Sequence, residues 1–262
     1  MIPKADIVAW RQQAPWVSDA QVEQDLVISR ALVAIFSDTE LSQMVAFRGG
    51  TALHKLYFKP SRRYSEDIDL VQIKAGPIGT VLDKLQAVLN LFLGTPKRKQ
   101  TLEGATLTYR MESEGPPVIT MRLKVEINTR EHFALQGVQR RPFAVSTRWF
   151  SGSCEIATYS LAELLATKLR ALYQRRKGRD LFDLWLGLTE GKADALKIIE
   201  IFKQYMAAEG QNIDIRTYKT NMQDKMKHAG FLSDLKPLLT ANLQYDVWEA
   251  FALVQREVIE RL

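Results

Sequence analysis

Two aspartates, Asp67 and Asp69, lie two residues apart in the otherwise apolar run DIDLVQI. Alternate side chains of a strand share a face, so both carboxylates project the same way, about 6.6–6.8 Å apart along the chain. Adjacent carboxylates repel each other, and hard oxygen ligands suit Mg²⁺ or Mn²⁺. The pair therefore predicts a metal site. The alternative is a half-exposed strand with charged side chains on its solvent side.

A third carboxylate, Glu126, lies in the β-branched run MRLKVEIN, on the same face as Arg122 and Lys124. If this strand pairs beside the DIDL strand, Glu126 converges with Asp67 and Asp69. Three carboxylates can hold two metal ions about 3.5–4 Å apart, the arrangement used for in-line phosphoryl transfer.

Gly49-Gly50-Thr51 comes directly before a helix-like stretch. Free backbone N–H groups and a hydroxyl at a helix N-terminus suit phosphate, and glycine lets the backbone approach the ligand closely. A glycine pair alone is more often a simple turn. Followed by a helix and then by the Asp-Ile-Asp strand, it predicts a triphosphate site beside a metal site.

The elements that would carry these residues follow from periodicity. A helix is expected over 18–36, with Ser18 as N-cap and Gln21 three residues later. A short apolar segment, MVAF, precedes the glycines, and a helix through TALHKLYF follows them. Further strands are expected in ATLTYRM and VITMRLKVEIN, and a helix over 79–93. The segments 97–100 and 114–117 are expected to be loops.

The character of the chain changes after about residue 160. Five stretches there have helical periodicity and strand patterns are nearly absent. Ser160 and Glu163 form a capping box at the first of them. We therefore expect an α+β fold, with a mixed, short-stranded sheet flanked by helices, followed by an all-helical C-terminal half.

Composition is that of an ordinary globular protein: 262 residues, 46% hydrophobic and 25% charged. No apolar run approaches the roughly 20 residues that span a bilayer, and the N-terminus has no apolar core typical of a signal peptide. The single cysteine, Cys154, fits a reducing cytoplasm and is expected to be a small buried hydrophobe.

The net charge of the chain is +6, and basic residues cluster at four places, each expected in a loop. They are Arg62-Arg63, Lys97-Arg98-Lys99, Arg140-Arg141 and Arg175-Arg176-Lys177. Each alone is compatible with a solvated loop tip. Together they favour a phosphate-rich ligand.

The ordered set of motifs resembles the AbiEii/AbiGii-type nucleotidyltransferase toxins, which include MenT-like toxins and belong to the DNA polymerase β-like nucleotidyltransferase superfamily. The motifs are FRGGTALHK (47–55), RYSEDIDL (63–70), KVEINTRE (124–131), LATKLRAL (165–172) and RDLFDL (179–184). The resemblance spans roughly residues 20–190. It implies a nucleotidyltransferase domain over 1–155 and a helical domain over 156–262 that completes the nucleotide cleft.

In this family Asp67 and Asp69 would be the main Mg²⁺ or Mn²⁺ ligands. Glu126 would be the third carboxylate and a candidate general base. The resemblance gives the β- and γ-phosphates of an NTP to the glycine motif and the loop after it, through Gly49, Gly50, Thr51, Ser65 and Arg63. Lys55 would either reach phosphate or be a solvated helix lysine.

Lys168 lies within an apolar stripe with Leu161, Leu165 and Leu172. A lysine there either extends its ammonium to water or points at an anion in a cleft, and the resemblance favours the second. Asp180 and Asp183 share one face of the next helix. The family implies that this helix closes the nucleotide site, with Asp180 as the stronger candidate.

The resemblance implies transfer of an NMP from an NTP to RNA, most plausibly the tRNA 3′ end. The chain would then be the cytoplasmic toxin of a toxin-antitoxin system, with a cognate antitoxin, a place in phage defence and no membrane partner. Alternatives are the same chemistry on a protein or a small molecule, or a non-catalytic NTP-binding regulatory module.

Overall fold

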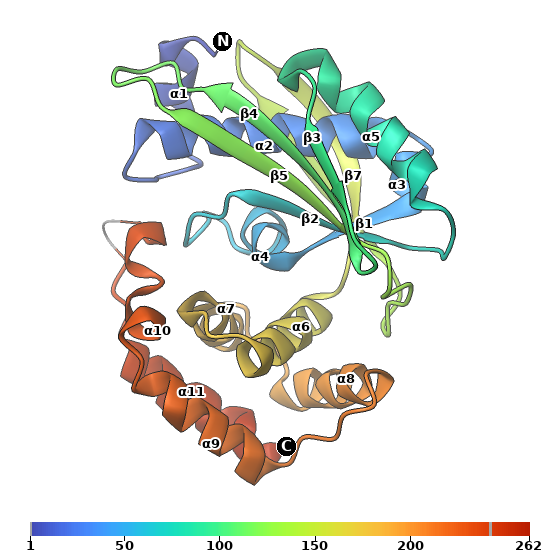
Figure 1. Cartoon of the computed structure of the whole chain (residues 1–262). Coiled ribbons are helices and arrows are strands. Elements are labelled where there is room, and N and C mark those ends of the chain that lie inside the picture. The colour runs from blue at the N-terminus through green and yellow to red at the C-terminus, as the bar shows by residue number, and fades with distance from the viewer. Residues whose placement is uncertain (1, 241–242) are drawn as a thin grey trace. The chain divides into compact units, whose positions relative to one another are not determined.

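A computed structural model describes residues 2–240 and 243–262 of the chain (Figure 1). The chain divides into two compact units, Met1–Tyr159 and Ser160–Leu262. The first holds the sheet and the second is built of helices. The boundary expected between residues 155 and 156 lies inside β7, the strand that ends the first unit, so the division falls just after that strand.

The first unit is organised around a seven-stranded sheet of order β3-β4-β5-β2-β1-β7-β6. The β2–β5 and β1–β7 pairs are parallel and the other pairs are antiparallel, so the predicted mixed sheet is confirmed. The strands are β1 (Val45–Arg48), β2 (Asp67–Gln72), β3 (Lys97–Gln100), β4 (Gly104–Glu112), β5 (Thr120–Asn128), β6 (Gln139–Ser146) and β7 (Ser151–Thr158).

Helices cover one face of this sheet, where α2 and α5 pack (Figure 1). The helical segments of the unit are α1 (Lys4–Trp10), α2 (Asp19–Ser37), α3 (Leu41–Met44), α4 (Gly49–Ala52), the π-helix η1 (Leu53–Tyr57) and α5 (Ile78–Leu93). At the start of α2 the Ser18 backbone N–H donates to Gln21 Oε1 at 3.3 Å, as expected from the capping pattern.

The apolar half of each alternating strand points toward the helices. Ile68 and Leu70 of β2 and Leu123 and Val125 of β5 are buried. Removing such side chains from water contributes about 1.5–3 kcal/mol each. This burial fixes the register of β2 and β5, because a slip by one residue would place their charged side chains in the core.

Two basic segments expected in loops are strands. Lys97–Gln100 forms β3, and Arg140 and Arg141 lie in β6. These are the two edge strands of the sheet. Edge strands commonly carry charged residues, which discourage pairing with another chain, so they lack the apolar alternation that predicts a strand.

The second unit contains the helices expected from periodicity. They are α6 (Leu161–Gln174), α7 (Gly178–Thr189), α8 (Ala195–Ala208), α9 (Ile215–Met226), α10 (Ala229–Ser233), the short 3₁₀ helices η2 (Lys236–Leu238) and η3 (Ile259–Arg261), and α11 (Val247–Glu257). Ser160 Oγ accepts the Glu163 N–H at 3.1 Å, which caps α6 as predicted. Across the described residues of the chain, no helix combines the length and apolarity needed to cross a membrane.

Candidate active site

Three charged side chains line up across neighbouring strands of the sheet. Arg48 at the end of β1 is the register partner of Asp69 on β2, and Asp69 is in turn the partner of Glu126 on β5. One step along β2, Asp67 is the partner of Lys124. The strand pairing on which convergence of the three carboxylates depended is therefore present.

The carboxylates project from the sheet face opposite the apolar core. Ile68 and Leu70 alternate with the aspartates and are buried, whereas Asp67 and Asp69 are half-buried and Glu126 is exposed. The pattern that predicted a shared face for the two aspartates is thus confirmed. Solvent reaches this face, so a substrate can reach it as well.

The electrostatics of the pair are unfavourable without a cation. Burial and the neighbouring Asp69 raise the pKa of Asp67 to about 7, an effect that Lys124 offsets only in part. Within residues 2–240 and 243–262, no group of three His, Cys, Asp or Glu side chains is gathered closely enough to hold a metal ion. Without a bound cation, electrostatic repulsion keeps such carboxylates apart.

Gly49 lets the backbone pass directly beside Asp69. Its φ is 79°, in the left-handed region that favours glycine, and a Cβ added there would lie 2.1 Å from Asp69 Oδ2. Gly50 also has a close neighbour, since a Cβ there would lie 2.3 Å from Arg63 Nη2. The glycine pair is therefore needed for packing between Asp69 and Arg63.

Thr51 ties the helix start to the Asp-Ile-Asp strand. Its Oγ1 lies 2.8 Å from Ser65 Oγ and 2.5 Å from the Asp67 carbonyl oxygen, and the side chain is 1% exposed. The phosphate role expected for Thr51 and Ser65 would have to be shared with these internal hydrogen bonds. These hydrogen bonds hold the start of the helical segment at Thr51 against the backbone of Asp67.

Arg63 lies in a loop, as expected, between η1 and β2, but it is not at a solvated loop tip. The side chain is 1% exposed and its Nη1 donates to the Tyr64 carbonyl at 3.1 Å. It lies beneath Gly50, where its positive charge faces the glycine backbone from inside the protein. Neighbouring Arg62 is half-exposed, and its backbone N–H donates to His54 Nδ1 at 3.4 Å.

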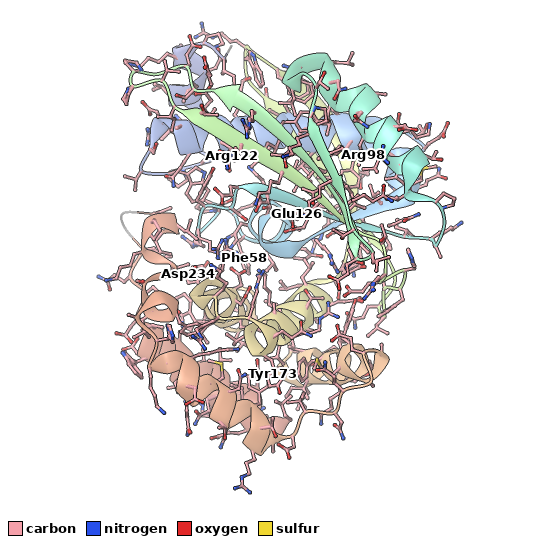
Figure 2. The ribbon with its side chains drawn as sticks, in the orientation of Figure 1. Phe58, Arg98, Arg122, Glu126, Tyr173 and Asp234 are labelled. Atoms are coloured by element: carbon pink, nitrogen blue, oxygen red, sulfur yellow. The ribbon has the colours of Figure 1, made fainter. Side chains whose placement is uncertain are left out.

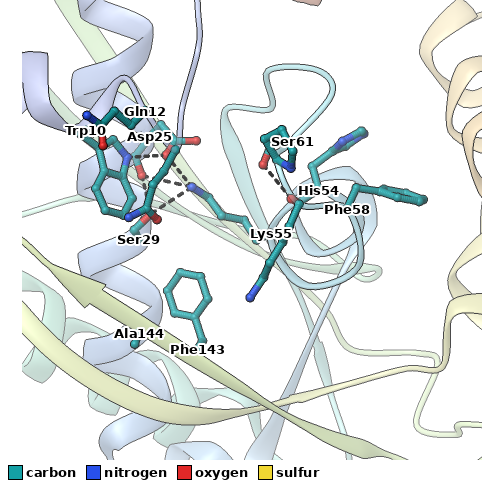
Figure 3. A pocket seen from close by; sticks show the side chains of 13 residues that line it. Trp10, Gln12, Asp25, Ser29, His54, Lys55, Phe58, Ser61, Phe143 and Ala144 are labelled. Atoms are coloured by element: carbon teal, nitrogen blue, oxygen red, sulfur yellow. Dashed lines mark hydrogen bonds and ion pairs between the residues drawn. The ribbon is translucent and has the colours of Figure 1, made fainter. Parts of the chain in front are cut away.

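Lys55 is not solvated, since its side chain is 9% exposed and forms an ion pair; its role at phosphate stays a prediction. Its Nζ lies 2.6 Å from Asp25 Oδ1 and 2.9 Å from Ser29 Oγ, both on α2 (Figure 3). Trp10 Nε1 and Trp16 Nε1 donate to the same Asp25 carboxylate at 2.8 and 3.2 Å. The lysine thus anchors η1 to α2 at the edge of a cavity of about 280 Å³.

Arg48 is the residue that sequence reasoning missed. It forms an ion pair with Glu131 and is the strand neighbour of Asp69. Burial opposes its ionisation, but the attraction of Glu131 and of Asp69 outweighs this and raises the pKa of Arg48. An arginine ending the apolar strand VAF, directly before Gly49, was the available signal.

Open space adjoins the carboxylates on both sides. A cavity of about 230 Å³ is lined by Arg48, Asp69 and Glu126. Another of about 550 Å³ is lined by Asp67, Arg122 and Lys124. Both are formed within the first unit, and each places a cation near a carboxylate. A ligand carrying both phosphate and metal would find complementary groups here.

In the helical unit Lys168 lies in a buried ion cluster. Its Nζ is 3.0 Å from Asp180 Oδ1 and 2.9 Å from Asp183 Oδ2, and its side chain is 7% exposed. Arg175 Nε also pairs with Asp180 Oδ2, at 2.7 Å. Burial alone would raise the pKa of Asp180, but Lys168 and Arg175 outweigh it and lower that pKa. The expectations for Lys168, extension to water or an anion in a cleft, did not include this internal cluster.

Comparison with known proteins shows the family of the chain. The sequence model of the family described as "Nucleotidyl transferase AbiEii toxin, Type IV TA system" matches residues 30–253. The chain belongs to the AbiEii family. It is a nucleotidyltransferase toxin of the type IV toxin-antitoxin systems, a class that implies an antitoxin partner.

Two solved structures share the fold of this AbiEii chain. MenT4, a nucleotidyltransferase toxin from Mycobacterium tuberculosis, superposes with a TM-score of 0.59 at 16% identity, covering 100% of this chain and 88% of MenT4. JHP933 from Helicobacter pylori gives a TM-score of 0.55 at 19% identity, with 94% of each chain covered. No curated protein matches the sequence.

The donor set of the AbiEii chain fits a divalent cation in its chemistry, whereas the three side chains are not gathered around a common point in this structure. Carboxylate oxygens of Asp67, Asp69 and Glu126 on one sheet face are the hard ligands that Mg²⁺ and Mn²⁺ prefer. Burial first, and the charge of Asp69 second, raise the pKa of Asp67. The sequence predicted that these three carboxylates share a face, because strand alternation is a local pattern. It did not predict that Arg48 lies beside Asp69, because the register between strands is not a local property.

Proposed function

We propose that this AbiEii toxin transfers an NMP from an NTP to a hydroxyl of RNA, at the 3′ end of tRNA, in the cytoplasm. The observation that supports this most directly is the parallel pairing of β2 with β5. It sets Asp69 beside Glu126 and Asp67 beside Lys124 on an accessible face. Carboxylates next to a glycine-started helix suit a nucleotide triphosphate and its metal.

In this proposal the acceptor oxygen attacks the α-phosphorus of the NTP. One O–P bond forms, the bond to the bridging oxygen breaks, and pyrophosphate leaves with the electron pair. Glu126, exposed at the end of β5, accepts the proton of the acceptor hydroxyl. A divalent cation held by Asp67, Asp69 and Glu126 would neutralise charge on the phosphates.

The remaining groups orient the nucleotide. Backbone N–H groups of the Gly49–Ala52 segment would face the β- and γ-phosphates, with the charge of Arg63 behind Gly50 adding to the attraction. Arg48 lies beside Asp69, at one end of the row formed by Arg48, Asp69 and Glu126. Participation of Lys168 and Asp180 in closing the nucleotide site remains a prediction, compatible with their role in stabilising α6 against α7.

The proposal is tested by incubating the protein with each labelled NTP, Mg²⁺ and either total RNA or total protein. We expect label in tRNA, at the 3′ end on sequencing. Asp69→Asn should abolish transfer and relieve growth inhibition, because it removes a charged oxygen ligand without changing size. Asp83→Asn is the matched control, since Asp83 is an exposed carboxylate on α5.

If the label is found only in protein, the acceptor is a protein and not RNA. NTP binding without turnover under any divalent cation would favour a regulatory module. Full activity of Asp69→Asn would exclude the role of the aspartate pair in catalysis.

A further inference from the structure

Five cationic side chains share the open face of the sheet that also carries the carboxylates. Register partners in a ladder point to the same side. Lys97 and Lys99 of β3 are partners of Thr108 and Thr106 on β4, which in turn are partners of Lys124 and Glu126 on β5; Arg110 and Arg122 are partners of each other. We call Lys97, Lys99, Arg110, Arg122 and Lys124 the basic strip.

The strip is exposed, and of its five residues only Lys124 has a carboxylate, Asp67, as a register partner. All five side chains are solvent-exposed, and within the described part of the chain none forms an ion pair; Lys124 interacts with Asp67 at longer range. Arg98, between the two lysines of β3, points to the other side and approaches Asp83 at 3.9 Å. Acidic neighbours lie around the strip: Glu112 on β4, Glu126 two residues after Lys124 on β5, and Glu103 near Arg130.

The chemistry of the strip suits phosphates rather than bases. Lysine and arginine alternate with Thr106 and Thr108, whose hydroxyls also donate hydrogen bonds to phosphate oxygens. The aromatic residue of β4, Tyr109, is buried on the opposite face, so these strands offer no stacking surface for bases. Alternate residues on one strand lie about 6.6–6.8 Å apart, which allows several successive phosphates to be contacted.

The strip is continuous with the proposed active site. Lys124 is the register partner of Asp67, and Thr106 is the partner of Glu126. Arg122, Lys124 and Asp67 line the same cavity of about 550 Å³. Figure 2 shows Arg122 and Glu126 on the one strand, β5, that links strip and site. A polyanion lying on the strip can therefore reach the carboxylates.

We propose that the basic strip binds the phosphate backbone of the RNA acceptor and delivers its 3′ end to the row of Asp67, Asp69 and Glu126. This rests on the proposed function, because it assumes that RNA is the acceptor. Contacts are made to phosphates, so binding on the strip is independent of base sequence. The strip lies wholly on β3, β4 and β5.

The test compares two variants with equal loss of charge. The strip variant is K97Q/K99Q/R110Q. Its three positions lie on β3 and β4, whereas the carboxylates lie on β2 and β5. The control is K74Q/R98Q/K203Q, three exposed cations outside the strip. Binding of a short fluorescent single-stranded RNA is measured by anisotropy over a salt series, with chelator and without NTP. Melting temperature and circular dichroism check that each variant is folded.

For the strip variant we expect at least about tenfold weaker binding at low salt. The slope of log K against log salt should fall by about 2, which corresponds to three lost phosphate contacts on a single strand. The control should retain the wild-type slope. Equal weakening of both variants would overturn the proposal, because it would mean that only net charge matters. Equal binding to anionic phospholipid vesicles, with the same loss in the strip variant, would also overturn it.

Failure of the strip and failure of the proposed function give different results. If wild type binds RNA through the strip but never labels it, the proposed reaction is wrong and the RNA surface stands. If wild type labels RNA and the strip variant has an unchanged KM for RNA, the strip is wrong and the reaction stands. Asp69→Asn should bind RNA with the wild-type slope.

Discussion

The backbone of Gly49 lies so close to Asp69 that any side chain at position 49 must displace the carboxylate. Gly49→Ala is therefore expected to lower NMP transfer by about 100-fold or more, since a displacement of about 1 Å at a reacting centre is enough for that loss. The measurement is the initial rate of label incorporation, together with the melting temperature.

Gly137→Ala is the matched control for this substitution. Gly137 has nearly the same backbone angle, φ 73°, but a Cβ there meets no heavy atom within 4 Å. Both variants carry the cost of a left-handed alanine, about 1–2 kcal/mol, and only Gly49→Ala also moves Asp69. Equal activity of the two variants would show that contact with Asp69 is unimportant.

Asp67 is expected to reduce the stability of the metal-free protein. Its folded-state pKa of about 7 is above the ordinary value, so above pH 7 its ionisation opposes folding, and this cost disappears as pH falls toward the ordinary value. Asp67→Asn should therefore raise stability by about 1–2 kcal/mol near pH 8, after allowance for solvent screening. Thermal unfolding in chelator near pH 8 and pH 5 tests this; a gain that is as large at pH 5 contradicts it.

At the scale of elements, α6 and α7 are joined by the buried cluster of Lys168 with Asp180 and Asp183. Lys168→Met removes the cation between two buried carboxylates and should destabilise the protein by about 3–5 kcal/mol in urea unfolding. Adding Asp183→Asn removes one of the negative charges and should recover much of this loss.

Lys203→Met provides the control for the loss of a lysine, because Lys203 is exposed on α8. Its effect on the free energy of unfolding should remain within about 0.5 kcal/mol. A change of that size for Lys168→Met would mean that the cluster contributes nothing to holding α6 and α7 together.

Elements with a strong period were predictable, and so were the residues whose placement depends on that period alone. Alternation in DIDLVQ and MRLKVEIN placed Asp67, Asp69 and Glu126 on the polar face of β2 and β5. Edge strand β3 was not predictable in this way, because all four of its residues are exposed and charge replaces alternation.

Pairs distant in sequence were also beyond local reasoning. Lys55 meets Asp25 thirty positions away, and Arg48 meets Glu131 across 83 positions. A helical or strand period says which way a side chain points, but not which element comes to face it. Lys55 and Lys168 were candidates for binding phosphate or an anion in a cleft. Each forms an ion pair with a carboxylate of another helix.

At the scale of the whole molecule, the two units are joined without a linker. β7 ends at Thr158 and α6 begins at Leu161, and the two residues between them, Tyr159 and Ser160, are buried. Limited chymotrypsin digestion of the native protein should therefore yield no fragment ending at Tyr159. Mass spectrometry of early digestion products makes the measurement, and a stable 1–159 fragment would contradict the buried junction.

The parallel pairing of β2 with β5 also bears on how the protein is made. The segment between these neighbouring strands contains α5, β3 and β4, so Glu126 reaches Asp69 only after more than fifty further residues have been synthesised. Such distant pairing forms late, because a long loop must close first. A nascent chain on the ribosome therefore lacks the complete carboxylate row for much of its synthesis. The toxin therefore cannot use this carboxylate row before β5 has been synthesised and paired with β2.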